Sequence, residues 1–496
     1  MSDKKVFLAF DLGAESGRAV VGEIRDDKLS LTEIHRFPTG GTKVNGQFHW
    51  NVLEFYSQVI KGLKIYVSKY GSKLDGIGID TWGCDFGLLD GKGNLIGIPY
   101  TYRDPRTSET PDIIEEKMGS RELYKLTGIQ MLPFNTLNQL ISMVESQDPV
   151  LSIAENILFI PDLLHYFLTG KKTAEYTIVS ISQLYNTVTK QWEPKIFKTF
   201  GIPERISTEV IKAGDIIGTL RSDIAKEVGL DEVPIIAPAV HDTASAAVAV
   251  PTSEKENYAF LSSGTWSIVG LELDKPIIND KSYEMNISNS GGALDKNLYL
   301  KNVMGLWILQ CCKKIWNKKI PGLSYPEIEQ MAEKAEPFRA FIDPDDMIFL
   351  NPSDATEVVV EYIKRTGQRA VDKNDIGQIS RIIFESLALK YRYVLEKLTD
   401  ATGNRVDVLY VTGGGSKNTL LNKFTANALG KKVTAGPVEA TAIGNIMIQS
   451  VGAGVYSSLE EIREVVRNSF EVIEYLPIDS GKWNDIYKEY IKIINP

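Results

Sequence analysis

Acidic and glycine-containing turns that could bind a phosphate group are the chemically most informative segments of this sequence. Residues 11–18 (DLGAESGR) contain two glycines and Asp11, and they join the apolar runs 6–10 and 19–24. Such a turn can hold its backbone N–H groups close to an anion. Asp11 ends a buried strand and therefore needs a cation, a donor or water beside it. The segment fits a phosphate with a metal ion, and it fits an ordinary surface hairpin equally well.

The same arrangement, a buried strand followed by a polar or glycine-rich turn, recurs along the chain. It is found at residues 80–85, 262–267 and 413–418, and another strand ends on His241-Asp242. Ligands of open α/β sheets collect beyond such strand ends. A nucleotide would use these turns as backbone donors, with Mg²⁺ held by a nearby carboxylate. The chain has no GxxxxGK[ST] segment, so two separate glycine turns would have to bind the phosphates.

Asp242 is the best candidate for a general base among these residues. It follows the apolar run 234–240, and apolar surroundings raise the pKa of a carboxylate. Its other interpretation is an N-cap for a helix over 243–249, which on spacing alone is the more common role. His241 is more often a packed residue than a ligand contact. Trp82 could stack on a sugar, although a Trp beside a strand end usually belongs to the core.

Composition excludes several functional classes. The chain has 496 residues, 43% of them hydrophobic and 24% charged, and a net charge of −9. These values are typical of a globular protein of two domains that binds neither nucleic acid nor an anionic membrane. The three cysteines form no disulfide framework, and the four histidines have no metal-ligand spacing. The apolar run 6–10 is too short for a signal peptide, so we expect a cytoplasmic protein.

The elements that must position these residues alternate between strands and helices. We predict a hairpin at 6–24, a third strand at 28–37, a helix beginning near Val52 and a strand at 74–80. Residues 86–99 predict another hairpin, and 111–169 predict mostly helix. Residues 258–273 repeat the strand, glycine turn and strand of the opening segment just past the midpoint, which suggests a duplicated domain. A buried strand at 406–412 then leads into a helix at 419–429.

Taken together, these segments resemble the FGGY carbohydrate kinases, most closely their rhamnulokinase branch. The matches run in order along the chain without large gaps, and jointly they are very specific. They lie at 11–18, 78–86, 102–107, 132–137, 241–245 (HDTAS), 261–267 (LSSGTWS), 301–307 and 413–422 (GGGSKNTLLN).

The resemblance implies a duplicated actin-like (ribonuclease H-like) α/β fold. We therefore expect two domains, each with a mixed five-stranded sheet flanked by helices, and an active site in the interdomain cleft. Residues 1–248 would bind the sugar and carry the first phosphate turn, and residues 249–496 would bind the nucleotide. The expected cofactors are ATP and Mg²⁺, and the expected form is a monomer or a homodimer.

The resemblance also implies roles for individual residues. Asp242 would be the catalytic base, and Asp11 would hold Mg²⁺. The sugar side would comprise Trp82, Gly83, His241 and Asp242. The nucleotide side would comprise Ala14, Glu15, Ser16, Gly17, Arg18, Gly264, Thr265, Asn302, Gln310, Gly413, Gly414 and Gly415. In the rhamnulokinase branch the acceptor is the 1-hydroxyl of L-rhamnulose.

Two departures from the family pattern leave questions for the structure. Relatives often have hydroxyl residues where this chain has Ala14-Glu15-Ser16, and a phosphate would be repelled by Glu15. We expect the Glu15 side chain to point outward and the backbone to bind. Many relatives also have Asn-Ala-Ser after an acidic-Tyr-Thr motif, whereas Glu175-Tyr176-Thr177 precedes Ile178-Val179-Ser180 here, which leaves the role of this segment open.

Other functions share part of this pattern. A kinase for another ketose, such as L-fuculose, would differ by a few pocket contacts that sequence does not place. An actin-like or chaperone-like ATPase would share the phosphate turns. His241-Asp242 and the 80–86 segment favour a small-molecule acceptor, and the retention of both Asp11 and Asp242 argues against an inactive sugar-binding module.

Overall fold

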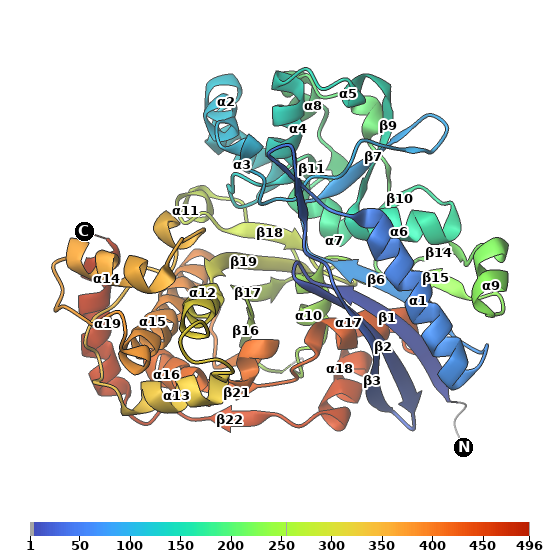
Figure 1. Cartoon of the computed structure of the whole chain (residues 1–496). Helices are drawn as coiled ribbons and strands as arrows, with labels where there is room; N and C mark the ends of the chain where they lie inside the picture. Colours follow the sequence, from blue (N-terminus) through green and yellow to red (C-terminus); the bar gives the residue numbers. More distant parts are fainter. Residues whose placement is uncertain (1–3, 254, 496) are drawn as a thin grey trace. The chain divides into compact units, whose positions relative to one another are not determined.

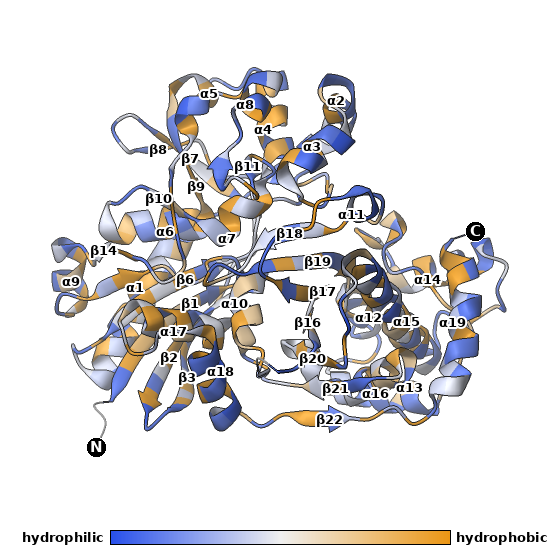
Figure 2. Ribbon diagram, turned by 180° about the vertical axis from the view of Figure 1, so that it is seen from behind, coloured by the Kyte–Doolittle hydropathy of each residue, from blue (hydrophilic) through white to orange (hydrophobic). Residues whose placement is uncertain are grey.

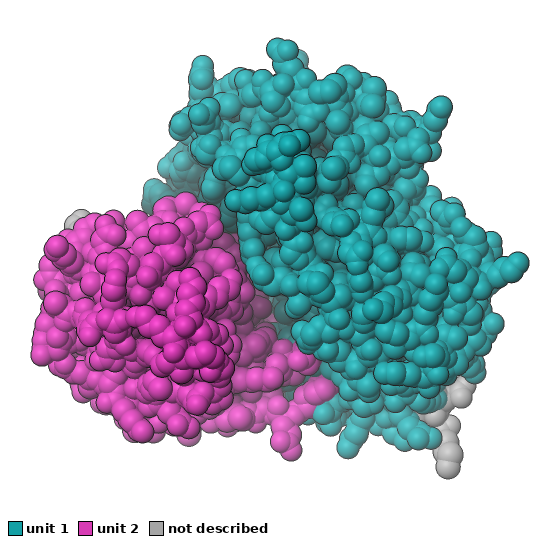
Figure 3. Space-filling view, viewed as in Figure 1, with its two compact units in different colours: residues 1–251, 272–299, 440–469 teal, residues 252–271, 300–439, 470–496 magenta. Residues whose placement is uncertain are grey.

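Two compact units make up the protein, which we describe from a computed structural model covering residues 4–253 and 255–495. Unit 1 comprises residues 1–251, 272–299 and 440–469, and unit 2 comprises 252–271, 300–439 and 470–496 (Figure 3). Each unit is therefore assembled from stretches that are distant in the sequence. The predicted division into 1–248 and 249–496 concerns which stretch binds which substrate, and it stays a prediction.

A mixed sheet forms the centre of unit 1 (Figure 1). Its strands β1 and β2 form the predicted hairpin, β3 extends it, and β6 lies parallel to β1. The sheet has six strands and not the expected five, because β14 pairs antiparallel with β15 and adds an edge strand. In sheet order the strands are β14 (Ile216–Thr219), β15 (Pro234–Ile236), β6 (Gly76–Thr81), β1 (Lys5–Leu12), β2 (Ser16–Arg25) and β3 (Lys28–Pro38).

The strand predicted over 234–240 is shorter than expected, because β15 ends at Ile236. Pro238 has no backbone N–H and cannot continue a ladder. The chain nevertheless stays beside β6, since Thr81 donates its N–H to the Val240 carbonyl at 2.9 Å and bridges to His241. His241-Asp242 thus follows an irregular extension of β15.

Helices cover both faces of this sheet. α1 (Val52–Tyr70) packs on β2 and β3, and α6 (Ile160–Thr169) packs on β6. α17 (Ala440–Gly452) packs on β1 and β6 and against α10 (Asp242–Val248), and α18 (Leu459–Ser469) packs on β3. Glycines permit this approach: a Cβ at Gly78 would lie 2.8 Å from the Asn445 side chain of α17. α9 (Ser222–Val228) packs against α1.

A second, smaller layer of unit 1 lies around a three-stranded sheet. β7 (Phe86–Asp90) pairs with β8 (Leu95–Ile96), which confirms the predicted hairpin. β9 (Ala154–Phe159) pairs with β7 inside the stretch predicted to be helical, so that prediction was wrong there. The six residues of β9 are too few for periodicity to separate a buried strand from a helix. The helices are α2 (Thr110–Lys117), α3 (Ser120–Thr127), α4 (Thr136–Glu145), α5 (Val150–Ile153), α7 (Tyr176–Val179) and α8 (Pro194–Phe200).

Short strands and one short helix complete unit 1. They are β4 (Thr42–Val44), β5 (Gln47–His49), β10 (Thr173–Glu175), β11 (Tyr185–Asn186), β12 (Gln191–Trp192), β13 (Glu209–Ile211), α11 (Asp280–Glu284) and β18 (Ser288–Gly291).

Unit 2 has a second mixed sheet that repeats the opening hairpin. β16 and β17 form the predicted hairpin, and β16 lies parallel to β20, as β1 lies parallel to β6 in unit 1. The unit 2 part of this sheet has six strands and not the expected five, because β22 pairs antiparallel with β21 at one edge. The neighbouring strands are β19 (Asn297–Met304), β17 (Trp266–Leu273), β16 (Tyr258–Ser263), β20 (Val408–Thr412), β21 (Lys432–Ala435) and β22 (Ile473–Tyr475).

The helices of unit 2 differ in how much of their surface is buried: α19 buries one face, whereas residues 382–391 of α15 are buried all round. In α19 the buried residues Trp483, Tyr487 and Tyr490 follow the helical spacing, and hydrophilic and hydrophobic stretches both colour the helix (Figure 2). Across the part of the chain that the structure describes, no helix is long and apolar enough to span a membrane. The helices are α12 (Trp307–Trp316), α13 (Tyr325–Lys334), α14 (Ala355–Arg365), α15 (Ile376–Thr402), α16 (Thr419–Leu429) and α19 (Ser480–Ile494).

Candidate active site

Three carboxylates gather at one edge of the unit 1 sheet. The register of β1 and β6 places Asp11 opposite Asp80, and the bridge from Thr81 to His241 brings Asp242 to the same edge. Burial raises the pKa of both Asp80 and Asp242, and the charge of Asp11 raises each pKa further. Parallel strands with their carboxyl ends aligned thus concentrate negative charge where a cation and phosphates could bind.

Asp242 does not cap a helix with its side chain. α10 begins at Asp242 itself, and His241 occupies the cap position without a side-chain bond to the helix. The Asp242 Oδ1 accepts a hydrogen bond from the Thr243 hydroxyl at 3.1 Å and lies 3.6 Å from His241 Nε2. Burial, and then the charge of Asp11, raises the pKa of Asp242 to about 7. A carboxylate with this pKa is suited to accept a proton near neutral pH.

His241 is neutral in this environment, because burial lowers its pKa to about 4. Its ring lies beside Gly83: a Cβ on that glycine would come within 3.3 Å of His241 Nε2. The structure therefore brings together Gly83, His241 and Asp242, which the sequence placed on the sugar side.

Asp11 is held by Arg18, its partner across the β1–β2 hairpin. Arg18 Nε and Nη2 donate to Asp11 Oδ2 at 3.0 and 2.7 Å. The turn between them is closed by the Gly13 N–H, which donates to the Ser16 carbonyl at 3.0 Å, and by the Thr39 hydroxyl on the Gly13 carbonyl. Ala14 and Gly17 lie in the same turn and the strand that follows it.

Glu15, the acidic residue of that turn, is exposed and paired. Its Oε1 accepts a hydrogen bond from Arg103 Nη1 at 2.7 Å, and Arg103 Nε donates to the Tyr102 hydroxyl at 3.2 Å. The guanidinium therefore neutralises the charge that a phosphate at this turn would meet. Arg103 lies in the 102–107 segment, and its pairing with Glu15 joins residues too far apart in the sequence to be predicted from it.

Trp82 is buried and not an open stacking surface, with 6% of the residue exposed. Its ring lies 4.3 Å from that of Trp50, and the indole N–H groups of both donate to Asp85 Oδ2, at 2.9 and 2.6 Å. Gln139 Nε2 donates to Asp85 Oδ1 at 2.8 Å. Burial raises the pKa of Asp85 to about 6 against the effect of these bonds. Sequence reasoning missed Trp50 and Gln139, because both reach Asp85 from distant parts of the chain.

The predicted nucleotide residues of unit 2 also come together. Gly264 and Thr265 form the turn between β16 and β17, and the Thr265 hydroxyl donates to Gln310 Oε1 of α12 at 3.2 Å. Leu306 donates its N–H to the Gly264 carbonyl at 3.0 Å, which fixes the start of α12 on this turn.

The Gly413–Gly415 turn reaches the same place from β20. Gly413 has a left-handed φ of +78°, and a Cβ there would lie 2.9 Å from the Ser263 carbonyl. A Cβ on Gly415 would overlap the Ser263 side chain, so glycine is required for this contact. Gly414 lies between them and has open space around its Cα. Asn302 lies on β19, the strand next to β17.

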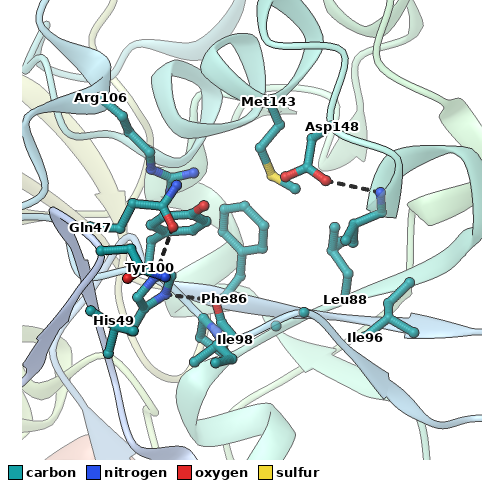
Figure 4. A pocket seen from close by; sticks show the side chains of 16 residues that line it. Gln47, His49, Phe86, Leu88, Ile96, Ile98, Tyr100, Arg106, Met143 and Asp148 are labelled. Carbon is teal, nitrogen blue, oxygen red and sulfur yellow. Dashed lines mark hydrogen bonds between the residues drawn. The ribbon is translucent and has the colours of Figure 1, made fainter.

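A separate cavity of about 310 Å³ lies in the smaller layer of unit 1 (Figure 4). Its polar side chains contact one another: the Arg106 guanidinium lies 3.7 Å from the centre of the Tyr100 ring, and His49 Nε2 lies 3.3 Å from Gln47 Oε1. Asp148 accepts the N–H of Val150 at 2.9 Å. None of the predicted site residues lines this cavity.

Comparison with known proteins decides the family. Residues 6–249 match the N-terminal domain of the FGGY family of carbohydrate kinases, and residues 259–453 match its C-terminal domain. The chain belongs to the FGGY family of carbohydrate kinases. A member of this family is a carbohydrate kinase that phosphorylates a sugar with ATP, typically with a divalent metal ion.

Relatives support this assignment over the whole length. A protein of Bacteroides thetaiotaomicron named rhamnulokinase is 44% identical, covering 98% of each chain, and one of Bacillus subtilis with the same name is 36% identical, covering 96% of each. A xylulose kinase structure from Lactobacillus acidophilus has a TM-score of 0.82 at 15% identity, covering 99% of this chain and 98% of its own. Plasmodium falciparum glycerol kinase with ADP has 0.78 at 18%, covering 99% and 97%. These structures show that this FGGY kinase has the fold expected from the sequence.

Proposed function

We propose that this kinase transfers the γ-phosphoryl group of ATP to the 1-hydroxyl of L-rhamnulose, giving L-rhamnulose 1-phosphate and ADP in the cytoplasm. The observation that carries the proposal is the agreement among relatives. Six of them, 36–44% identical over 95–99% of this chain, have the name rhamnulokinase. The matched regions therefore cover both the segments proposed to bind the sugar and those proposed to bind the nucleotide.

Asp242 is the proposed general base. As the sugar oxygen bonds to the γ-phosphorus and the bond to the ADP oxygen breaks, the proton of the hydroxyl passes to the Asp242 carboxylate. Its raised pKa and its place beside His241 and Gly83 support this role. His241, Gly83 and Trp82 would contact the sugar, although only a small part of Trp82 is exposed.

Mg²⁺ would be held by Asp11, and the donor chemistry at this edge fits it. Mg²⁺ binds one or two carboxylates together with waters and substrate phosphates, not a dedicated protein cage. The described residues contain no cluster of three or more His, Cys, Asp or Glu placed to hold a metal ion by themselves. Asp80 Oδ1 is buried nearby without a hydrogen-bond partner, and burial, followed by the charge of Asp11, raises the pKa of this carboxyl group. When bound, the metal would neutralise phosphate charge during transfer.

The phosphates of ATP would be bound by two turns. Backbone groups of residues 14–17 with the Arg18 side chain form one, and Gly264 with Thr265 forms the other. Arg18 already orients Asp11, so it would position the metal ligand as well as a phosphate. Asn302, Gln310 and the glycines 413–415 would surround the adenosine, which the contacts of Gln310 with Thr265 and of Gly415 with Ser263 support.

A coupled assay of ADP release tests the substrate. Purified enzyme would be assayed with L-rhamnulose, L-fuculose, L-ribulose and D-xylulose under the same conditions. We expect the highest kcat/KM with L-rhamnulose. A higher value with L-fuculose would overturn the substrate assignment, and ADP release that does not depend on any sugar would favour an ATPase of the actin or chaperone type.

The base is tested separately by Asp242→Asn. This variant keeps the size of the side chain and removes its ability to accept the proton, so we expect kcat to fall by about 10²-fold or more. Binding of L-rhamnulose, measured by calorimetry, should persist. Near-normal turnover would show that another carboxylate is the base.

A further inference from the structure

Glu175 and Thr177 contact the backbone of the two residues that precede Asp242. These residues belong to the segment whose role the sequence left open. β10 ends at Glu175, and its carboxylate caps α7 by accepting the Thr177 N–H at 3.0 Å. The Thr177 hydroxyl also donates to the same carboxylate oxygen. The pair is therefore one hydrogen-bonded unit, fully buried in both members.

This unit accepts the two backbone N–H groups that immediately precede Asp242. Val240 donates to Glu175 Oε2 at 3.2 Å, and His241 donates to Thr177 Oγ1 at 3.2 Å. In addition, Thr81 of β6 donates its N–H to the Val240 carbonyl. Three hydrogen bonds thus fix the backbone of residues 240 and 241, although the regular strand ended at Ile236.

We propose that Glu175 and Thr177 are positioning residues for phosphoryl transfer, setting the place of the Asp242 carboxylate by fixing the backbone of Val240 and His241. The inference rests on the proposed role of Asp242 as the base. Neither residue touches the substrate in this proposal. They act on the chemistry because a base misplaced by about 1 Å can cost about 10²-fold in rate.

The cost of burying Glu175 argues against a role in packing alone. Burial raises its pKa to about 7, and the groups that oppose the rise are hydrogen-bond donors, namely Thr177 and the N–H groups of Val240 and Ala213, with no cation among them. The adjacent Asp162 is also buried, and its Oδ1 accepts the Glu175 N–H at 3.1 Å. An apolar residue would fill this space without the desolvation cost, but it could not bind the Val240 N–H.

Ser180 anchors the other end of this segment within unit 1. Its hydroxyl donates to the Thr177 carbonyl at 2.9 Å and accepts the Gly291 N–H at 2.8 Å. The Thr177 backbone is therefore tied to β18 while its side chain is tied to His241. Ser180 therefore has a structural role in this chain, where Ile178-Val179 precede it in place of the Asn-Ala found in many relatives.

Thr177→Val removes the hydroxyl while keeping the shape of the side chain. We expect kcat with L-rhamnulose to fall about tenfold or more, with KM for sugar and ATP changed by less than about twofold. Thr177→Ser restores the hydroxyl and should keep kcat within about threefold of the unchanged enzyme. The matched control is Thr208→Val, which removes another buried hydroxyl of unit 1, one that donates to the Ile157 carbonyl at 2.7 Å.

The control separates positioning from stability. Both valine variants should lower the melting temperature, but only Thr177→Val should lower kcat. Equal loss of kcat in the two, or a normal kcat in Thr177→Val, would overturn the proposal. If Thr177→Val does not fold, Thr177→Cys takes its place, since a thiol is a weaker acceptor of similar size, and the same comparison of kcat with Thr208→Val decides.

Assaying Asp242→Asn beside these variants keeps the two proposals distinct. Inactive Asp242→Asn with normal Thr177→Val means that only the positioning role fails. Active Asp242→Asn means that the base assignment itself fails.

Discussion

Asp242 combines the two causes that most strongly change the acidity of a carboxyl group. Burial disfavours its charged form, and the neighbouring charge of Asp11 disfavours it further, which together raise its pKa to about 7. His241 beside it stays neutral and contributes no compensating positive charge. The residue is therefore poised to exchange a proton in the neutral range, where an ordinary aspartate would not.

The pH dependence of catalysis follows from this pKa. Below it the carboxyl is protonated and cannot accept the sugar proton, so kcat/KM should fall as the pH drops through about 7. The measurement is the pH profile of kcat/KM for the sugar between pH 5 and 9. The residual activity of Asp242→Asn should lack this acidic limb. A limb centred near 4, the usual range for aspartate, would contradict the structure.

Glu15 shows how an ion-pair partner changes the electrostatic effect expected of a residue. Alone, its carboxylate would repel a phosphate at the 11–18 turn, but Arg103 Nη1 lies 2.7 Å from it and neutralises it. The pair is partly exposed, so its contribution to stability is small. The pair is expected to act on the electrostatic potential at the proposed phosphate site.

Arg103→Met should therefore weaken nucleotide binding by leaving Glu15 unpaired. We expect the KM for ATP to rise about three- to tenfold, and the double variant with Glu15→Gln to recover most of the loss. Steady-state kinetics at low and high salt would measure both effects. Lys117→Met serves as the control, because it breaks an exposed pair with Glu145 elsewhere in unit 1. Additive effects of Arg103→Met and Glu15→Gln would contradict the coupling.

Among the elements, α17 packs on β1 and β6 and contacts the buried Asp80 near the end of β6. Asn445 Nδ2 donates to the buried Asp80 carboxylate at 2.5 Å, and Gln449 Nε2 donates to Asn445 Oδ1 at 2.6 Å. Gln449 also donates to the Leu8 carbonyl of β1. This chain of bonds requires the helix to lie unusually close to β1 and β6, and Gly444 makes the closest approach, to the Ser245 backbone of α10.

Gly444→Ala should therefore destabilise the protein despite the higher helix propensity of alanine. A Cβ at Gly444 would overlap the Ser245 carbonyl, and forced overpacking of this kind costs about 1–3 kcal/mol. Thermal or urea unfolding would measure the loss. Gly481→Ala, at a glycine of α19 with open space around it, is the matched control and should be neutral or stabilising by about 0.5–1 kcal/mol. Equal effects of the two substitutions would show that α17 can move.

At the scale of the whole molecule, the proposed sugar contacts belong to unit 1, whereas the proposed nucleotide contacts come from the 14–18 turn of unit 1 and from unit 2. Asp242, His241 and Gly83 belong to unit 1, whereas Thr265, Gln310 and Gly413–Gly415 belong to unit 2. The unit 2 contacts are built on a separate sheet, so substitutions among them should leave sugar binding unchanged.

Ligand-dependent stability can test this division. A ligand that binds only the folded protein raises its stability by about 2.7 kcal/mol at 100 times its Kd. Thr265→Val removes the hydroxyl that contacts Gln310, so it should reduce the rise in melting temperature caused by MgADP and leave the rise caused by L-rhamnulose. Scanning calorimetry with each ligand alone measures both. Loss of the sugar effect in this variant would contradict the division.

Much of this organisation could be predicted from local sequence. The hairpins β1–β2 and β16–β17, the buried strands β6 and β20, and α16 over Thr419–Leu429 all follow from apolar runs interrupted by glycine turns. The prediction was wrong where the local signal was short or overridden. β9 lies in a stretch with helical composition, and the strand before Asp242 ends early because Pro238 cannot donate to a ladder.

The sequence by itself determined the family, the duplicated strand-turn-strand pattern and Asp242 as the candidate base, because these depend on residue types and spacings that stay adjacent along the chain. Only the tertiary structure decided which groups surround them. The pairing of Glu15 with Arg103, the Trp50 and Gln139 bonds to Asp85, and the support of Val240 and His241 by Glu175 and Thr177 join residues far apart in the sequence. Charge, burial and hydrogen bonding between such residues exist only after the chain has folded. In the 11–18 turn, the sequence left open whether the Glu15 carboxylate would repel a phosphate. In the folded protein Arg103 neutralises this carboxylate, and Arg18 holds Asp11 in the same turn.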